Sequence, residues 1–146
     1  MLDLITNAAQ KRLWADFQRA FSSKVAQDFL ATLLNLMKIV FVINPDYRRN
    51  IENFNGRYQF LSKDERLKVG VVFGGGRMAV VDEKIDRPDI TIAFRDGRTL
   101  LDFIFSPRQD ILGAMLRHDV ETTGNLNYLY KFGYMAKALQ RMMPQL

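Results

Sequence analysis

The sequence predicts an α/β protein: a five-stranded, mainly antiparallel sheet with helices packed on one face, preceded by two N-terminal helices. Two patterns lead to this class. Five short segments between residues 56 and 124 alternate apolar and polar side chains, as half-buried strands do. Other segments repeat apolar side chains every three or four residues, as amphipathic helices do. We therefore predict an N-terminal helical extension over residues 1–50 and a second, sheet-containing domain over residues 51–146.

The two N-terminal helices are predicted over residues 1–21 and from Ser23 to Val42. In the first helix, apolar residues recur four positions apart. The serine at position 22 and Ser23 can end this helix and cap the next one. Pro45 stops the second helix, because proline lacks the N–H donor that would continue it.

The second helix contains an apolar block over residues 29–43 that resembles a membrane segment. The block has fifteen residues, fewer than the roughly 20 that a helix needs to cross a bilayer. Asn35 and Lys38 also interrupt it. We therefore predict a buried or interfacial helix rather than a membrane span.

Three strands follow, and they begin near Gly56, Leu67 and Arg77. Residues 62–65 and 74–76 join them and have the composition of hairpin loops. The three glycines of the second loop lack the lysine and serine of a phosphate-binding P-loop, so a flexible hairpin tip is predicted. Alternation along each strand indicates one face on a core and one face partly in solvent, which is antiparallel behaviour.

The stretch from Asp89 to Gly124 is predicted to form a strand, two helices and a strand. Alternation marks the strands at residues 90–94 and 120–123. The second helix follows Ser106-Pro107, where serine can cap and proline suits the first helical position. The two short helices carry almost no side chains of catalytic type, which indicates an apolar container rather than a reaction site.

The last helix is predicted from Asn125 to Met142. Its apolar residues step by four, three, four and three positions and form one continuous seam: Tyr128, Phe132, Met135, Leu139 and Met142. The methionines make this seam soft and adaptable, which suits either ordinary core packing or an apolar ligand of variable shape.

Composition excludes several classes of site. The chain of 146 residues has no cysteine, so disulfides, thiolate metal sites and cysteine nucleophiles are ruled out. Its single histidine removes most zinc-enzyme and serine-triad sites, which usually need an imidazole. The formal net charge of +5 suits an anionic membrane surface or a nucleic acid as partner, and it also suits simple solubility.

The sequence gives little support to two more specific functions, catalysis by a His118–Asp119 dyad and nucleic-acid binding. His118 precedes Asp119, but neighbours in a strand point to opposite faces, so we predict no catalytic dyad. Nucleic-acid binding would need aromatic side chains among the basic residues of an exposed sheet face. Only Tyr47 and Tyr58 are candidates for that role. Nucleic acid is therefore not favoured as a partner, and neither catalytic nor metal-ligating residues are predicted.

From about Asn55 to Met142 the sequence resembles the sterol carrier protein-2 domain, a small lipid-binding fold. The resemblance lies in the order and spacing of elements. These are the strand start at 56–60, the strand entry at 88–91, the helix pair around Ser106-Pro107, and the strand and helix on either side of Gly124. The first fifty residues extend beyond this match. Bacterial members of the family that assist isoprenoid-quinone synthesis also carry helices ahead of the domain.

The resemblance implies a non-enzymatic, cofactor-free carrier of a hydrophobic ligand, with an apolar tunnel between sheet and helices. The ligand would be a fatty acyl, sterol-like or isoprenoid-quinone lipid, and the protein would act in the cytoplasm, as an accessory factor of quinone synthesis. The residues predicted to line the tunnel are Leu100, Phe103, Ile104, Leu112, Met115, Phe132 and Met135.

A second function stays open beside the first. The same fold with a filled core would be a structural or protein-interaction module that dimerises or docks through its N-terminal helices. The partners predicted are thus a hydrophobic small molecule or lipid, an anionic membrane surface and a second copy of the chain.

Overall fold

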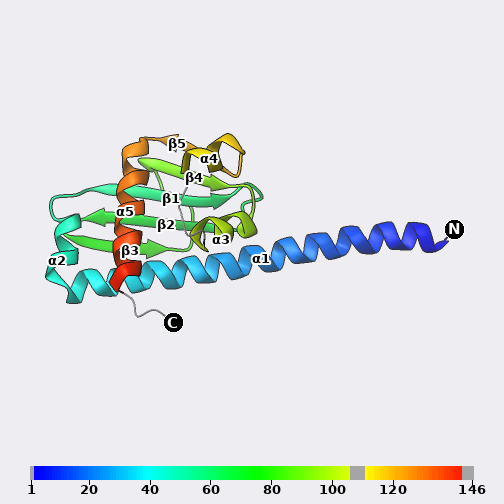
Figure 1. Ribbon diagram of the computed structural model, residues 1–146, viewed down its shortest axis with the longest axis horizontal. Helices are drawn as coiled ribbons and strands as arrows, with labels where there is room; N and C mark the ends of the chain where they lie inside the picture. Colours follow the sequence, from blue (N-terminus) through cyan, green and yellow to red (C-terminus); the bar gives the residue numbers. More distant parts are fainter. Residues whose placement is uncertain (1, 106–110, 143–146) are drawn as a thin grey trace.

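The computed structural model describes residues 2–105 and 111–142, without the side chains of residues 2–8, 14–22, 104, 105 and 111. The Ser106-Pro107 cap predicted for the second short helix lies outside these residues. The elements in chain order are α1 Leu2–Ile43, α2 Pro45–Arg48, the 3₁₀ turn η1 Arg49–Ile51, β1 Gly56–Ser62, β2 Lys68–Gly74, β3 Arg77–Val81, β4 Ile90–Phe94, α3 Gly97–Phe105, α4 Ile111–Leu116, β5 Val120–Gly124 and α5 Leu126–Met142. Figure 1 shows α5 crossing one face of the sheet, and α1 passing beside β3 and continuing far beyond the sheet.

The sheet has five strands in the order β3-β2-β1-β4-β5. Three neighbouring pairs are antiparallel, but the central pair, β1 with β4, is parallel. The sheet is therefore mixed, and the antiparallel arrangement expected from alternation holds only on either side of that pair. Tyr58 pairs with Val71 on one side and with Ile90 on the other, so all three side chains share the face that the helices cover.

The parallel pair requires a crossover from β3 at the edge to β4 beside β1. Residues 82–89 make it across the face of the sheet opposite the helices. There, the Ile85 N–H donates to Gln59 Oε1 at 2.6 Å, and the Gln59 amide donates to the Glu83 carbonyl. A Cβ built on Gly70 would lie 2.4 Å from Ile85 Cγ2, so only glycine lets the crossover pass this close. Alternation along a strand does not reveal such a connection.

The N-terminal region is one helix, not the two that were predicted. α1 runs unbroken from Leu2 to Ile43. The sequence over this range contains no glycine or proline, and a serine in a helix interior costs only about 0.5 kcal/mol relative to alanine. Ser23 consequently lies buried within the helix instead of capping one.

The second half of α1 contributes one face to the protein's core. Five of its side chains recur at helical spacing and are at most 2% exposed: Ala26, Leu30, Leu34, Met37 and Phe41. They pack with the apolar face of the sheet, and each large one contributes roughly 1.5–3 kcal/mol by leaving water. By length and composition alone the segment Ser23–Ile43 could also cross a membrane. The division of the chain at residue 50 stays a prediction, although this core contains residues from both sides of it.

Two buried tyrosines hold α5 in place across the sheet. The Tyr47 hydroxyl donates to the Met135 carbonyl at 2.7 Å, and the Tyr58 hydroxyl donates to the Tyr128 carbonyl at 2.8 Å. The acceptors are seven residues apart, or about two helical turns. Tyr47, expected to be a candidate for nucleic-acid stacking, instead stacks on Phe41 in the core. Burial raises the pKa of both hydroxyls well above its usual value, because an ionised phenol would lose its hydration.

We expect Tyr47→Phe to destabilise the fold by about 1 kcal/mol, the net contribution of one hydrogen bond. The buried tyrosines should also make the stability of the folded protein depend on pH. Above about pH 10 the unfolded chain ionises this tyrosine while the folded chain keeps it neutral, so wild-type stability should fall as pH rises. The double variant Y47F/Y58F should show a shallower decline in urea denaturation between pH 8 and pH 11. Tyr130→Phe on the exposed face of α5 is the control, and an equal decline in all three proteins would contradict the role assigned to the two tyrosines.

Candidate functional site

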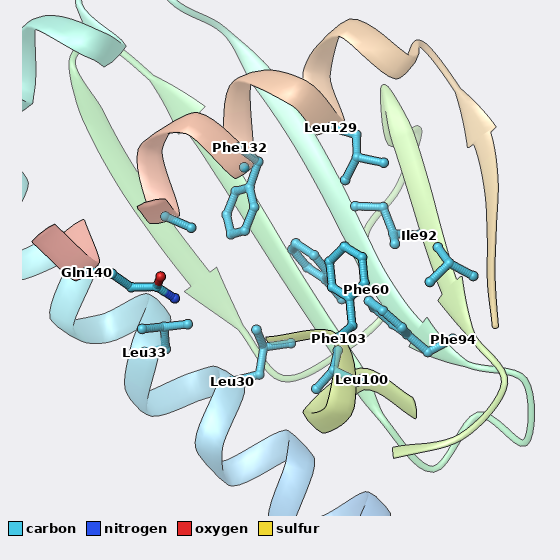
Figure 2. Close-up of a pocket in the computed structure, with 13 residues that line it drawn as sticks. Leu30, Leu33, Phe60, Ile92, Phe94, Leu100, Phe103, Leu129, Phe132 and Gln140 are labelled. Atoms are coloured by element: carbon cyan, nitrogen blue, oxygen red, sulfur yellow. The ribbon is translucent and has the colours of Figure 1, made fainter. Parts of the chain in front are cut away.

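An apolar cavity of about 50 Å³ lies between the sheet and helices α1, α3 and α5 (Figure 2). The described residues that line it come from six elements: Leu30, Leu33, Phe60, Ile92, Phe94, Leu100, Phe103, Val120, Leu129, Phe132, Gly133, Ala136 and Gln140. Helices and strands thus enclose it together, and a ligand inside would touch both layers of the fold.

The cavity exists because α5 presents small residues there. Gly133 and Ala136 face it where a larger side chain would fill the space. Aromatic rings form much of the remaining wall. Phe60 and Phe132 have ring centroids 5.2 Å apart, and a second pair, Phe94 with Phe103, stands 5.8 Å apart. Such tilted pairs are favourable in themselves, so the walls have a preferred arrangement without a ligand.

The described lining carries no charge. Its one polar side chain is Gln140, which is exposed, and Leu33 beside it is half-buried. Figure 2 shows these two residues on the same side of the cavity, between α1 and α5. Because Gln140 is exposed, solvent reaches this side, which we call the mouth; the other described side chains of the lining are hydrocarbon or aromatic. A guest with a long apolar body fits this chemistry, whereas a charged one would lose its hydration without compensation.

Three of the seven residues predicted from sequence line this cavity. They are Leu100 and Phe103 on α3, and Phe132 on α5. Met135 is fully buried but points elsewhere in the core, and Met115 is half-buried outside the lining. Leu112 is 64% exposed on α4 and also lies outside it. The side chain of Ile104 lies outside the described residues.

The lining residues that α1 and the strands contribute were not predicted from the sequence. Leu30 and Leu33 were assigned to an extension, so their role in a cavity wall was not considered. Phe60, Ile92 and Phe94 had the correct phase for the buried face of the sheet, and that phase was the available signal. The phase of alternation indicates that a side chain is buried, but it does not tell whether that side chain packs tightly or lies beside a cavity.

The last helix also differs in one residue of its predicted apolar seam. Met142 is 46% exposed, and the buried positions are Leu129, Phe132, Met135, Ala136 and Leu139. The helix ends at Met142, beyond the part that the sheet covers (Figure 1). The predicted seam was therefore correct along the middle of the helix and wrong at its end.

The other candidate groups have structural explanations. His118 lies exposed in a turn with φ of 60°, before β5 begins at Val120, and not in the strand where it was expected. The neighbouring Asp119 carboxylate instead contacts Arg95 at 3.2 Å and Arg117 at 3.0 Å. Within residues 2–105 and 111–142, no three His, Asp or Glu side chains whose positions are described come together as a metal site would require.

No protein-family model and no curated protein matches this sequence. Solved structures match it by fold. A protein described as UbiJ-SCP2, a ubiquinone synthesis protein, is 15% identical and gives a TM-score of 0.57 over 74% of this chain and 92% of its own. The sterol carrier protein domain 2 of Helicoverpa armigera is 14% identical and gives 0.52 over 80% of this chain and 91% of its own. The chain therefore has the fold of sterol carrier protein-2 domains, which confirms at the level of fold the resemblance seen in the sequence.

We expect Leu100→Ala to destabilise the protein by about 2–5 kcal/mol, because the lost methyl groups enlarge an existing cavity in a wall that is 1% exposed. The same substitution at Leu112 should change stability by only about 0.5 kcal/mol or less, as is usual on a surface. Chemical denaturation of the two variants measures both effects. Equal losses at the two positions would show that α4 packs more closely than this structure indicates.

Proposed function

We propose that the protein binds and carries a hydrophobic ligand, without converting it, in the cavity between the sheet and the helices. The observation that carries this proposal is the uncharged lining of the cavity among the described residues, with Leu33 and Gln140 on a side that solvent reaches. The fold supports it, because the two similar structures are described as a sterol carrier domain and a ubiquinone synthesis protein. A fatty acyl, sterol-like or isoprenoid-quinone lipid has the required chemistry.

The ligand must widen the cavity to enter it. Pockets for small molecules usually measure about 300–1,000 Å³, whereas this one measures about 50 Å³. A chain that buries about 400 Å² of apolar surface gains on the order of 10 kcal/mol. Part of that gain offsets the free-energy cost of separating the aromatic walls and of immobilising the ligand. The unliganded protein would therefore be the contracted form.

Binding without reaction follows from the same chemistry. The described lining contains no nucleophile, no titratable group and no cluster of metal ligands. Gln140 can orient a polar head at the mouth through a hydrogen bond, but an amide neither takes up nor releases a proton in general acid–base catalysis. A cytoplasmic accessory role in quinone synthesis belongs to this proposal as its narrower form.

We expect Leu33→Arg to weaken the binding of fluorescent fatty acyl, sterol and prenyl-quinone probes at least tenfold, because it places a charge at the mouth. Leu112→Arg is the matched control: it adds the same charge on exposed α4, outside the lining, and should leave binding unchanged. Circular dichroism confirms that both variants fold. Saturable binding that survives Leu33→Arg, or that Leu112→Arg abolishes, would place the ligand elsewhere.

A second candidate function rests on the outer face of α1. This face lies opposite the one buried in the core, yet it also carries apolar side chains: Ile39 is 55% exposed and Ile43 is 71% exposed. A helix that is apolar on two sides usually has a partner on each. The N-terminal half of α1 extends beyond the sheet, and no other helix or strand of the described chain lies beside it (Figure 1). An interaction module that pairs α1 with a second copy of the chain would cover it, and an anionic membrane surface is the other predicted partner.

For the second-copy form of this function, light scattering should give about twice the 16.9 kDa of one chain. The double variant I39E/I43E should return the mass to that of a monomer, because two carboxylates would be buried in the interface. A wild-type protein that is monomeric at all concentrations would reject the dimer. Binding of that monomer to anionic vesicles, lost in the double variant, would identify the membrane as the partner.

A further inference from the structure

A second concave site lies at the C-terminal end of α1, beside the tip of the β2–β3 hairpin. It is a groove of about 690 Å³, and it shares no lining residue with the apolar cavity. Its walls come from the last turns of α1, from α2 and from the hairpin, which Figure 1 shows close to α2. The lining residues are Lys38, Phe41, Val42, Arg48, Val72, Gly74, Gly76, Arg77, Met78 and Ala79.

The groove is positively charged. Lys38, Arg48 and Arg77 come from three separate elements, and no carboxylate is among the described lining residues. None of the three has a described carboxylate within 4.0 Å, whereas Arg49, Arg95 and Arg117 are each paired with an aspartate. Unpaired cations along a concave wall focus a positive potential, which raises the local concentration of anions.

One of the three cations is held in a fixed position. Arg48 Nη1 donates to the Val42 carbonyl at 2.8 Å and to the Phe41 carbonyl at 3.3 Å, so its guanidinium caps the C-terminal end of α1. Lys38 and Arg77 are exposed and make no contact of this kind. The groove thus combines one preorganised donor group with two cations that are free to close on a ligand.

The rest of the wall is apolar or bare backbone. Phe41, Val42 and Met78 supply hydrocarbon and an aromatic ring, and Val42 is 68% exposed. At the hairpin tip a Cβ on Gly76 would meet nothing within 4 Å, so the glycine leaves this end of the groove open. Cations beside exposed apolar surface are the combination that an anionic amphiphile requires, since its head and its chain need different surroundings.

We propose that this groove binds the anionic head of an amphiphile, a phosphate or carboxylate group, with the first part of its apolar chain against Phe41, Val42 and Met78. The anion would lie among Lys38, Arg48 and Arg77. This site is independent of the carrier function proposed above, because the two sites have no residue in common. A ligand could therefore occupy either one while the other is empty.

The test uses monomeric dihexanoylphosphatidylglycerol and the zwitterionic dihexanoylphosphatidylcholine as a matched pair of probes. Amide chemical shifts of Gly74, Gly76 and Arg77 report on the groove. The anionic probe should shift them saturably, and the zwitterionic probe should not. The double variant K38Q/R77Q should weaken binding roughly tenfold or more, because it removes two of the three cations. It leaves Arg48 in place, since that residue also caps α1.

The control variant K137Q/R141Q removes the same two residue types from exposed positions of α5, outside the groove, and should bind as the wild type does. Equal shifts with both probes, or a loss of affinity that is the same in the two double variants, would overturn the proposal. Competition with inorganic phosphate separates the two sources of the anion. Displacement of the anionic lipid by an equal concentration of inorganic phosphate would assign the groove to free phosphate groups and overturn the amphiphile. Retention of the lipid would support a site for a head together with its chain.

Discussion

The burial of one face of α1 against the sheet is the constraint on which the rest of the structure depends. Ala26, Leu30, Leu34, Met37 and Phe41 are all at most 2% exposed, so the helix cannot rotate about its axis without exposing core residues. This fixed orientation places Leu33 at the mouth of the apolar cavity and Lys38 in the cationic groove. It also turns Ile39 and Ile43 toward solvent. Three surfaces with different chemistry therefore follow from a single packing interaction.

The second determinant is the position of α5, which closes the cavity. Its side chains alone would allow several positions over an apolar sheet, because dispersion and hydrophobic contacts are not directional. Hydrogen bonds from Tyr47 and Tyr58 to two of its carbonyls select one position, since an unsatisfied buried hydroxyl would be costly. With the helix placed there, Gly133 and Ala136 face the sheet and leave the gap that the neighbouring aromatic rings surround.

The small size of this gap connects stability with binding. A contracted cavity preserves contacts between its walls, and a permanently open cavity of ligand size would forfeit them at a cost that grows with its volume. The protein is therefore compact when empty, and a ligand must replace the wall contacts it disrupts. A long apolar molecule can do so because it restores contact on every side. A small polar molecule cannot, so the proposed carrier function would favour long apolar ligands.

The sequence by itself determined the elements and their buried faces. The five strands, the crossing helix α5 and the apolar side of α1 all follow from periodicity, because a period of two or of 3.6 states which side chains share a face. Periodicity does not state what that face packs against. Leu100 and Leu112 have the same chemistry and similar helical surroundings in sequence, yet one lines the cavity and the other is exposed. The parallel pairing of β1 with β4 and the position of Tyr47 in the core were decided only by tertiary structure, because each depends on contacts between residues far apart in the chain, which leave no local pattern. The single helix α1 is different: its range has no glycine or proline, and the prediction of two helices gave the serines at 22 and 23 too much weight.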